Sequence, residues 1–225
     1  MIAVVPARGG SKGLPRKNVL PLAGLPLIVH SLRCALAARE ISRVVVSTDD
    51  EEIAAVARSV EGVEVPFMRP AHLATDSASA IDVHLHAAEA LGTSELCVLL
   101  PTAPLRRAED VDASVRLFRE RKAEAVLSVT AAKPAAWQQA LAPDGRLSPP
   151  PGLASSIDNR QGYGEVVIPN GAVYVLDMEA LARSRTYFGS RSFGHVMPAS
   201  RSIDIDGPDD LLMAEALLAH REAAA

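Results

Sequence analysis

Aromatic residues, cysteines and long apolar runs are all scarce in this sequence. Phe, Trp and Tyr make up 4% of the 225 residues, so Val, Leu, Ile and Ala must build the core. The two cysteines, Cys34 and Cys97, stand in apolar surroundings, and we expect buried thiols in a reducing cytoplasm rather than a disulfide. Pro, Arg or His interrupts the apolar runs and no signal peptide is recognisable, so we expect a cytoplasmic protein without a membrane span.

An excess of positive charge is also missing. The formal net charge is −4, which argues against non-specific binding of nucleic acid. Hydrophobic residues make up 48% of the chain, enough for a substantial core. The length suits one α/β domain that covers residues 1–225.

Strand-like and helix-like patterns alternate along the chain. Strands are expected at 1–5, 43–47, 63–67, 96–100, 125–130 and 170–176, and helices at 25–39, 79–91, 108–121 and 208–220. A further helix follows the second strand, with Thr48 and Asp49 as candidate N-caps. This alternation predicts a doubly wound, mainly parallel sheet, in which ligands bind beyond the carboxyl ends of the strands.

Residues 131–169 interrupt this pattern. The stretch is rich in Pro and Gly and is long for a loop inside one compact domain. We interpret it as an excursion from the domain, and an Ω-like loop of a monomer is the alternative.

The first strand leads directly into a glycine-rich, cationic loop. Gly9, Gly10 and Gly13 allow close backbone approach. Four cations share the loop: Arg8, Lys12, Arg16 and Lys17. Backbone N–H groups and cations together suit a triphosphate, although the order Ser11-Lys12-Gly13 is not a P-loop and G-x-G-x-x-G is absent. A basic surface loop without a ligand is the alternative.

A second polar pattern lies near the end of the chain, at 202–206. Alternation predicts a strand with Ile203 and Ile205 inward and with Asp204 and Asp206 together on the other face. Two such carboxylates suit Mg²⁺, which also takes phosphate oxygens and water. The alternative is a polar strand face that ends in a helix cap, with Asp206 or Asp209 as the cap.

These segments resemble the signatures of the CMP-sugar-acid synthetases, the cytidylyltransferases that activate sialic acid and its relatives. The matches in the first loop are Ala7, Arg8, Gly10, Ser11, Lys12, Lys17 and Asn18. Arg69, Leu73, Ala74, Asp76 and Ser79 match a segment that contacts cytosine in the family, although Ala80 replaces a serine. The pair of aspartates, Asp204 and Asp206, matches the family's metal-binding segment.

The resemblance implies a Rossmann-like nucleotidyltransferase fold, CTP as substrate, Mg²⁺ as cofactor and a homodimer in which the 131–169 excursion reaches the partner. The implied nucleotide-binding residues are Ala7, Arg8, Gly9, Gly10, Ser11, Lys12, Lys17, Asn18, Arg69, Asp76 and Ser79. The implied catalytic residues are Arg8, Lys17, Arg160 and Asp206, and the metal ligands are Asp204 and Asp206. An acceptor hydroxyl would attack the α-phosphorus of CTP and release pyrophosphate, with Asp206 one candidate for the general base.

The acceptor side departs from the family's pattern. The implied acceptor-binding residues are Leu100, Thr102, Arg106, Arg160, Gln161, Asn170 and Tyr174. Leu100 stands where the family has glutamine, Ile168 where it has arginine, and Ala135, Ala136 and Trp137 where a lysine is expected. Arg160 is the candidate partner for the acceptor's carboxylate, or else a surface arginine. We therefore expect a sugar acid of the nonulosonic type other than N-acetylneuraminate, or a different small acid.

Two other functions stay open at this point. A sugar-1-phosphate nucleotidyltransferase has a related loop, but that loop usually ends in Pro-Lys, whereas this one ends in Lys17-Asn18. A regulatory module that binds a nucleotide without turnover would not need Asp204 and Asp206.

Overall fold

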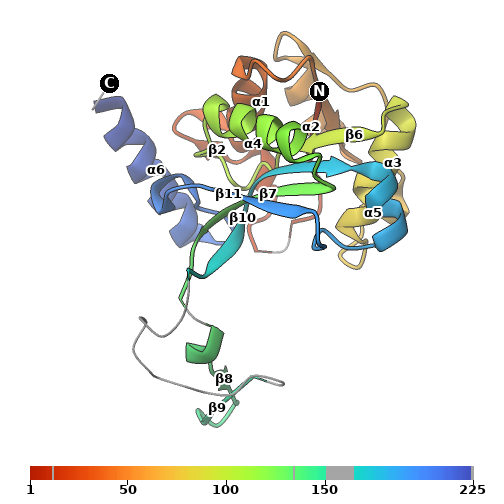
Figure 1. Ribbon diagram of the computed structural model, residues 1–225. Helices are drawn as coiled ribbons and strands as arrows, with labels where there is room; N and C mark the ends of the chain where they lie inside the picture. Colours follow the sequence, from red (N-terminus) through yellow and green to blue (C-terminus); the bar gives the residue numbers. More distant parts are fainter. Residues whose placement is uncertain (12, 134, 151–164, 224–225) are drawn as a thin grey trace.

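The computed structural model describes residues 1–11, 13–133, 135–150 and 165–223 (Figure 1). Its centre is a seven-stranded sheet with the order β11-β7-β10-β6-β1-β4-β5. The strands are β1 (Ile2–Pro6), β4 (Arg43–Ser47), β5 (Val63–Glu64), β6 (Glu95–Val98), β7 (Ala125–Ala131), β10 (Val167–Asp177) and β11 (Ser192–Val196). Neighbours run parallel except at β10, which is antiparallel to both β6 and β7. The prediction of a mainly parallel sheet is confirmed.

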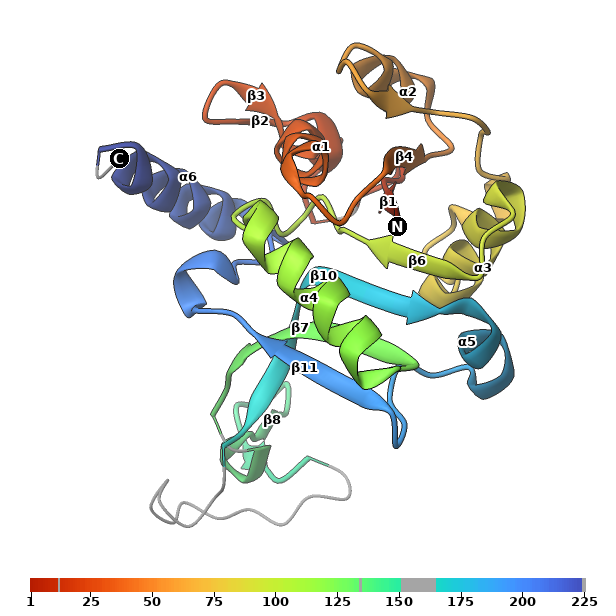
Figure 2. The same cartoon turned by 45° about the horizontal axis from the view of Figure 1, so that its top comes forward.

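Helices cover both faces of the sheet (Figure 2). One face carries α1 (Leu27–Ala37), α2 (Glu51–Arg58) and α4 (Ala108–Arg121), and the other carries α3 (Ala80–Leu91) and α5 (Met178–Ser184). Successive residues of a strand point to opposite faces, so Ala3 and Val5 join the first layer and Val4 the second. Doubly wound packing is therefore confirmed, with a core of small aliphatic side chains.

The C-terminal helix α6 (Pro208–Ala223) packs away from the sheet centre. Its Ala214 and Leu218 meet Leu22 and Leu27, next to the short hairpin of β2 (Pro21–Leu22) and β3 (Leu25–Pro26). Both cysteines are free, Cys97 in the core and Cys34 half-buried. Among the described residues, no helix is long and apolar enough to cross a membrane.

Between β7 and β10 the chain leaves the core as an extension, which we call the arm (132–150 and 165–169; Figure 1). Its described part contains a small hairpin of β8 (Ala140–Leu141) and β9 (Leu147–Ser148), in which Leu141 and Leu147 are exposed. Arg160 and Gln161 lie outside the described residues, so their predicted roles stay predictions.

Some expected boundaries were wrong. Residues 202–206 form no strand in the described structure. Asp50, rather than Thr48 or Asp49, caps α2, because its side chain accepts a hydrogen bond from the Ile53 amide at 3.0 Å. The strand expected at 63–67 is only two residues long, and β11 was not expected.

Candidate active site

A cavity of about 560 Å³ opens where β1 and β6 end, as expected for a doubly wound sheet. Residues from distant parts of the chain line it: Pro6, Arg8, Ser11, Gly13, Lys17, Asn18, Arg69, Ala80, Val83, His84, Leu100, Pro101, Thr102 and Asp206. The structure thus brings together the first loop, the Arg69 segment, the end of β6 and one of the two late aspartates.

The first loop follows β1 and is held from several sides. Asn18 is buried, and its Nδ2 donates to the Arg8 carbonyl oxygen at 2.9 Å. The Gly9 amide donates to Asp49 at 3.3 Å. Asn18 therefore shapes the loop, whereas Lys12 lies outside the described residues.

Arg8 connects this loop to the segment that follows Arg69. Its guanidinium lies 2.9 Å from the Asp76 carboxylate and donates to the Thr75 carbonyl oxygen at 3.1 Å. Asp76, expected at the nucleotide, is therefore an ion-pair partner of Arg8. Ser79 likewise acts as the N-cap of α3, because its hydroxyl accepts from the Ile81 amide at 3.2 Å.

The loop's cations are not equivalent. Arg16 turns to the N-terminus of α2, where it pairs with Asp50 at 2.5 Å and with Glu52. These hydrogen bonds raise the pKa of Arg16 and lower that of Asp50 to about 2. Arg16 therefore fixes the loop to α2, and Arg8 and Lys17 are the described loop cations that line the cavity.

Lys17 lies against residues 202–206, the segment that carries Asp204 and Asp206. Its Nζ donates to the Ile205 carbonyl oxygen at 2.6 Å and to Asp206 Oδ1 at 3.1 Å, and its side chain is 13% exposed. The Ile205 amide in turn donates to the Thr102 carbonyl oxygen at 2.7 Å. The segment therefore contacts the two neighbouring walls through the backbone of Ile205 and not through strand pairing.

Arg69 and His84 lie together on the opposite wall. Burial lowers the pKa of Arg69, whose Nη2 donates to Asp49 Oδ1 at 3.3 Å. Its Nε is buried and has no hydrogen-bond partner in the described part of the chain. Burial, with Arg69 nearby, lowers the pKa of His84 to about 4. Sequence reasoning missed His84 and Val83 as cavity residues, although their spacing from Ala80 places all three on one helix face.

Asp204 and Asp206 are the predicted metal ligands, and of the two only Asp206 is among the residues that line the cavity. Asp206 lines the cavity and is exposed. Asp204 is exposed as a whole residue, but its carboxylate lies close to Gly171 and receives a hydrogen bond from Thr102. Desolvation, together with the charge of Asp206, raises the pKa of Asp204.

This donor set fits a hard cation that also binds substrate oxygens. The described residues contain no cluster of three or more His, Cys, Asp or Glu side chains able to hold a metal. Two neighbouring carboxylates agree with the preference of Mg²⁺ for one or two carboxylates plus phosphate and water.

Of the five predicted acceptor residues that the structure describes, two line the cavity and three do not. Leu100 and Thr102 line it. Arg106 is 2% exposed, and its guanidinium donates to the Ala172 and Ala103 carbonyl oxygens at 2.9 and 2.8 Å. Asn170 is buried and bonded to Ser128 at 2.6 Å. Direct binding of the acceptor by Arg106 or Asn170 is not supported, because their polar groups are used inside the protein.

Tyr174, the third predicted acceptor residue that does not line the cavity, lies on β10 together with Ile168, one of the positions that depart from the family's pattern. Tyr174 is half-buried against Tyr187, with ring centroids 5.5 Å apart. Ile168 lies where β10 enters the arm and is 51% exposed. A match to a sequence motif does not show whether a side chain faces a ligand or the protein interior.

Comparisons with known proteins agree with this geometry. The fold resembles that of a CMP:2-keto-3-deoxy-manno-octonic acid synthetase solved with CTP, with a TM-score of 0.72, 20% identity and coverage of 98% of both chains. An N-acylneuraminate cytidylyltransferase of Escherichia coli is 35% identical over 95% of this chain and 51% of its own length. A CMP-N,N'-diacetyllegionaminic acid synthase of Legionella pneumophila is 30% identical over 97% of this chain and 96% of its own length.

The chain thus spans about half the length of the Escherichia coli relative and nearly all of the Legionella pneumophila relative. The family model for cytidylyltransferases matches residues 2–145. The chain therefore belongs to the cytidylyltransferase family.

Proposed function

We propose that this protein transfers CMP from CTP to a hydroxyl group of a sugar acid of the nonulosonic type and releases pyrophosphate. One observation carries the proposal: a single cavity brings together the cationic glycine loop, buried Arg69 and Asp206. The relatives' names, which describe CMP-sugar-acid synthesis, support the same class of reaction.

The triphosphate would lie on the first loop. Arg8 and Lys17 line the cavity and offer charge-assisted hydrogen bonds, and Ser11 adds a hydroxyl. Lys12 belongs to the same loop by sequence and is proposed as a further phosphate ligand. Asn18 and the Asp76 carboxylate act indirectly, because they hold the backbone and side chain of Arg8.

The base would lie between the first loop and α3. Arg69 has a buried Nε that lacks a partner among the described residues, and a cytosine carbonyl oxygen could accept from it. His84 is neutral at pH 7 because its pKa is about 4, so it offers no competing positive charge there.

Asp204 and Asp206 would hold Mg²⁺. When bound, the ion would supply positive charge near the phosphate oxygens.

The acceptor hydroxyl attacks the α-phosphorus in line with the leaving group. An O–P bond forms to the acceptor, the bond between the α-phosphorus and the bridging oxygen breaks, and pyrophosphate leaves. The side chains position the reactants and neutralise developing charge, which is the main task in phosphoryl chemistry. Asp206 is the candidate to take the hydroxyl proton through Oδ2, because its carboxylate is exposed at the cavity and Lys17 donates to its other oxygen, Oδ1.

A pyrophosphate-release assay tests the proposal. The protein is mixed with Mg²⁺, one of the four ribonucleoside triphosphates and a panel of nonulosonic and smaller sugar acids. We expect release that depends on both CTP and an acid, with CTP preferred over UTP, ATP and GTP. Faster release with UTP or GTP and the best acceptor would contradict the cytosine assignment, and no release with any acid would contradict the reaction.

A further inference from the structure

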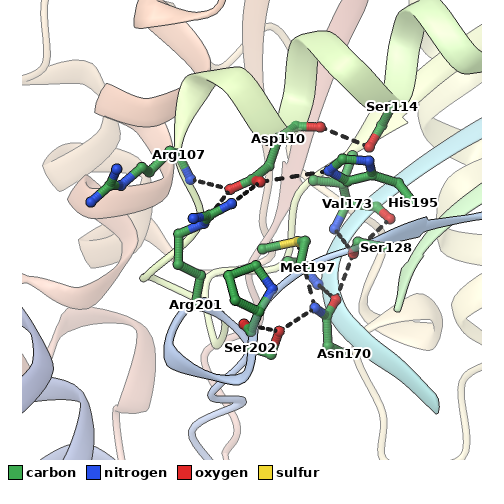
Figure 3. Close-up of polar contacts among 12 residues, drawn as sticks. Arg107, Asp110, Ser114, Ser128, Asn170, Val173, His195, Met197, Arg201 and Ser202 are labelled. Carbon is green, nitrogen blue, oxygen red and sulfur yellow. Dashed lines mark hydrogen bonds and ion pairs between the residues drawn. The ribbon is translucent and has the colours of Figure 1, made fainter. Parts of the chain in front are cut away.

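A buried carboxylate outside the cavity joins three separate parts of the chain (Figure 3). Asp110, on the first turn of α4, is 3% exposed. It accepts two hydrogen bonds from the guanidinium of Arg201, at 2.7 and 3.0 Å, and one from the Arg107 amide at 2.9 Å. His195 of β11 lies 3.5 Å away. Burial favours the neutral acid, but hydrogen bonds from these partners hold the pKa of Asp110 well below its usual range.

The residue after Arg201 is anchored as well (Figure 3). The Ser202 hydroxyl accepts from Asn170 Nδ2 at 2.8 Å and donates to the Pro198 carbonyl oxygen at 2.9 Å. Asn170 is itself fixed, because its Oδ1 accepts from Ser128 at 2.6 Å. Two consecutive residues are therefore attached to the buried interior.

These anchors lie at the start of the segment that brings Asp206 to the cavity. Residues 202–206 carry Asp204 and Asp206, yet pair with no strand in the described structure. The backbone of this segment contacts the other cavity walls through the Ile205 amide, which donates to the Thr102 carbonyl oxygen, and the Ile205 carbonyl oxygen, which accepts from Lys17. The buried side chain of Ile205 holds the middle of the segment, but without ladder contacts the position of its start depends on the residues that anchor it.

Asp110 is suited to be that anchor. Helix α4 begins immediately after 100–106, the stretch that contributes Leu100, Pro101 and Thr102 to the cavity. The Arg201–Asp110 pair therefore ties one wall of the cavity to the wall that carries the aspartates. A two-bond guanidinium–carboxylate pair fixes direction as well as distance.

We propose that Asp110 and Arg201 form a positioning pair, which sets the place of residues 202–206 and thereby of Asp206 and Lys17 at the triphosphate. The pair itself touches no substrate. The part of the proposal that concerns turnover rests on the proposed function, and the part that concerns the segment does not.

The chain offers a matched control on the same helix. Asp112 is also buried, and its Oδ1 accepts from the Glu40 amide at 2.9 Å, on a loop that does not line the cavity. Asp110→Asn and Asp112→Asn make the same chemical change at similar burial. Arg201→Gln provides a second variant at a less buried site, should Asp110→Asn fail to fold, and Arg201→Lys keeps the charge while losing the two-bond geometry.

The first measurement is amide hydrogen exchange in the ligand-free proteins. We expect exchange of the Ile205 amide to be at least tenfold faster in Asp110→Asn and Arg201→Gln, and unchanged in Asp112→Asn. Unchanged exchange at Ile205 in Arg201→Gln, or equal acceleration in Asp112→Asn, would overturn the proposal.

The second measurement is steady-state kinetics at saturating CTP and Mg²⁺. We expect kcat to fall about a hundredfold in Asp110→Asn, as for a misplacement of about 1 Å, with partial recovery in Arg201→Lys relative to Arg201→Gln. Loss of kcat in equal measure in Asp112→Asn would show a general structural effect instead. If the wild type turns over no acid while exchange responds as expected, the proposed function fails and the positioning of the segment stands.

Discussion

The glycines of the first loop have different reasons to be glycine. A Cβ on Gly9 would lie 2.5 Å from Asp50 Oδ2, and one on Gly13 would lie 2.4 Å from the Asp206 carbonyl oxygen. A Cβ on Gly10 meets nothing within 4 Å. Packing thus requires two of the glycines, and Gly10 is the position where the bare backbone is open to a ligand. The sequence shows only that all three lack side chains.

Replacement of Lys17 tests the phosphate site at the residue scale. We expect Lys17→Ala to lower turnover at least tenfold, because the ammonium proton that is not donated to Ile205 or Asp206 offers the triphosphate a charge-assisted hydrogen bond worth about 1.5–3 kcal/mol. Lys122→Ala, at the exposed end of α4, is the control and should leave turnover unchanged. The measurement is pyrophosphate release together with thermal unfolding, and unchanged kinetics in a folded Lys17→Ala protein would remove Lys17 from the site.

His84 predicts a pH dependence of stability. The pKa of His84 is about 4 in the folded protein, whereas an ordinary histidine has a pKa of 6.5. As the pH falls, His84 is therefore protonated in the unfolded chain before it is protonated in the folded protein. The free energy of unfolding should therefore fall between pH 6.5 and 4, by up to about 3 kcal/mol from this group. This stabilisation is complete above pH 6.5.

Urea unfolding of the wild type and of His84→Gln at pH 7 and pH 5 isolates this contribution. We expect a smaller loss of stability between the two pH values in His84→Gln, because the other titrating groups are shared. An equal loss in both proteins would mean that His84 is not held neutral in the fold.

At the scale of elements, periodicity located most helices and strands but not their directions. The predicted ranges for β4 and α4 agree with the structure, because both have clear apolar patterns. The reversal at β10 could not be predicted, since alternation is the same for either strand direction. The edge strand β11 was missed because Ser192, Gly194 and His195 dilute its apolar pattern.

The segment 202–206 shows what alternation does and does not report. Ile205 is fully buried and Asp206 is exposed, as predicted, but the segment lacks strand pairing. Alternation reports the side-chain directions of an extended chain and not its hydrogen-bond partners. The convergence of the first loop, Arg69 and Asp206 was predictable from sequence, whereas the inward orientation of Arg106 and Asn170 depends on tertiary contacts.

Leu100, just after β6, and Ile168, at the start of β10, lead to a prediction about the acceptor. We expect N-acetylneuraminate to be a poor acceptor, because Leu100 and Ile168 leave polar groups of the sugar unpaired at about 1–3 kcal/mol each. Two such losses lower kcat/KM roughly a hundredfold. Leu100→Gln combined with Ile168→Arg should raise kcat/KM for this sugar.

Val167→Arg, combined with Leu100→Gln, is the control. It adds the same charge on the other face of β10, because successive residues of a strand alternate. The steady-state assay compares the two double variants with the wild type. Wild-type turnover of N-acetylneuraminate as fast as that of any other acid tested would refute the prediction.

At the scale of the whole molecule, several apolar side chains on and beside the arm are exposed to solvent. Leu141, Leu147, Val196 and Ile168 are 71%, 67%, 58% and 51% exposed. Val196 and Ile168 pair with Val129 and Thr130 at the end of β7 from which the arm extends, and Leu141 and Leu147 lie in the β8–β9 hairpin of the arm. An exposed apolar group of this kind is characteristic of a protein interface.

We therefore expect a homodimer in which the arm packs on a second copy of the chain. Light scattering should give about twice the chain mass of 23.7 kDa. Leu141→Glu with Leu147→Glu should shift the mass towards one chain, because each buried leucine contributes about 1.5–3 kcal/mol and a buried unpaired carboxylate is costly. Leu212→Glu, on α6 and 66% exposed, is the matched control and should leave the mass unchanged. A wild-type mass near that of one chain at working concentration would contradict the dimer, and dissociation by Leu212→Glu alone would move the interface from the arm to α6.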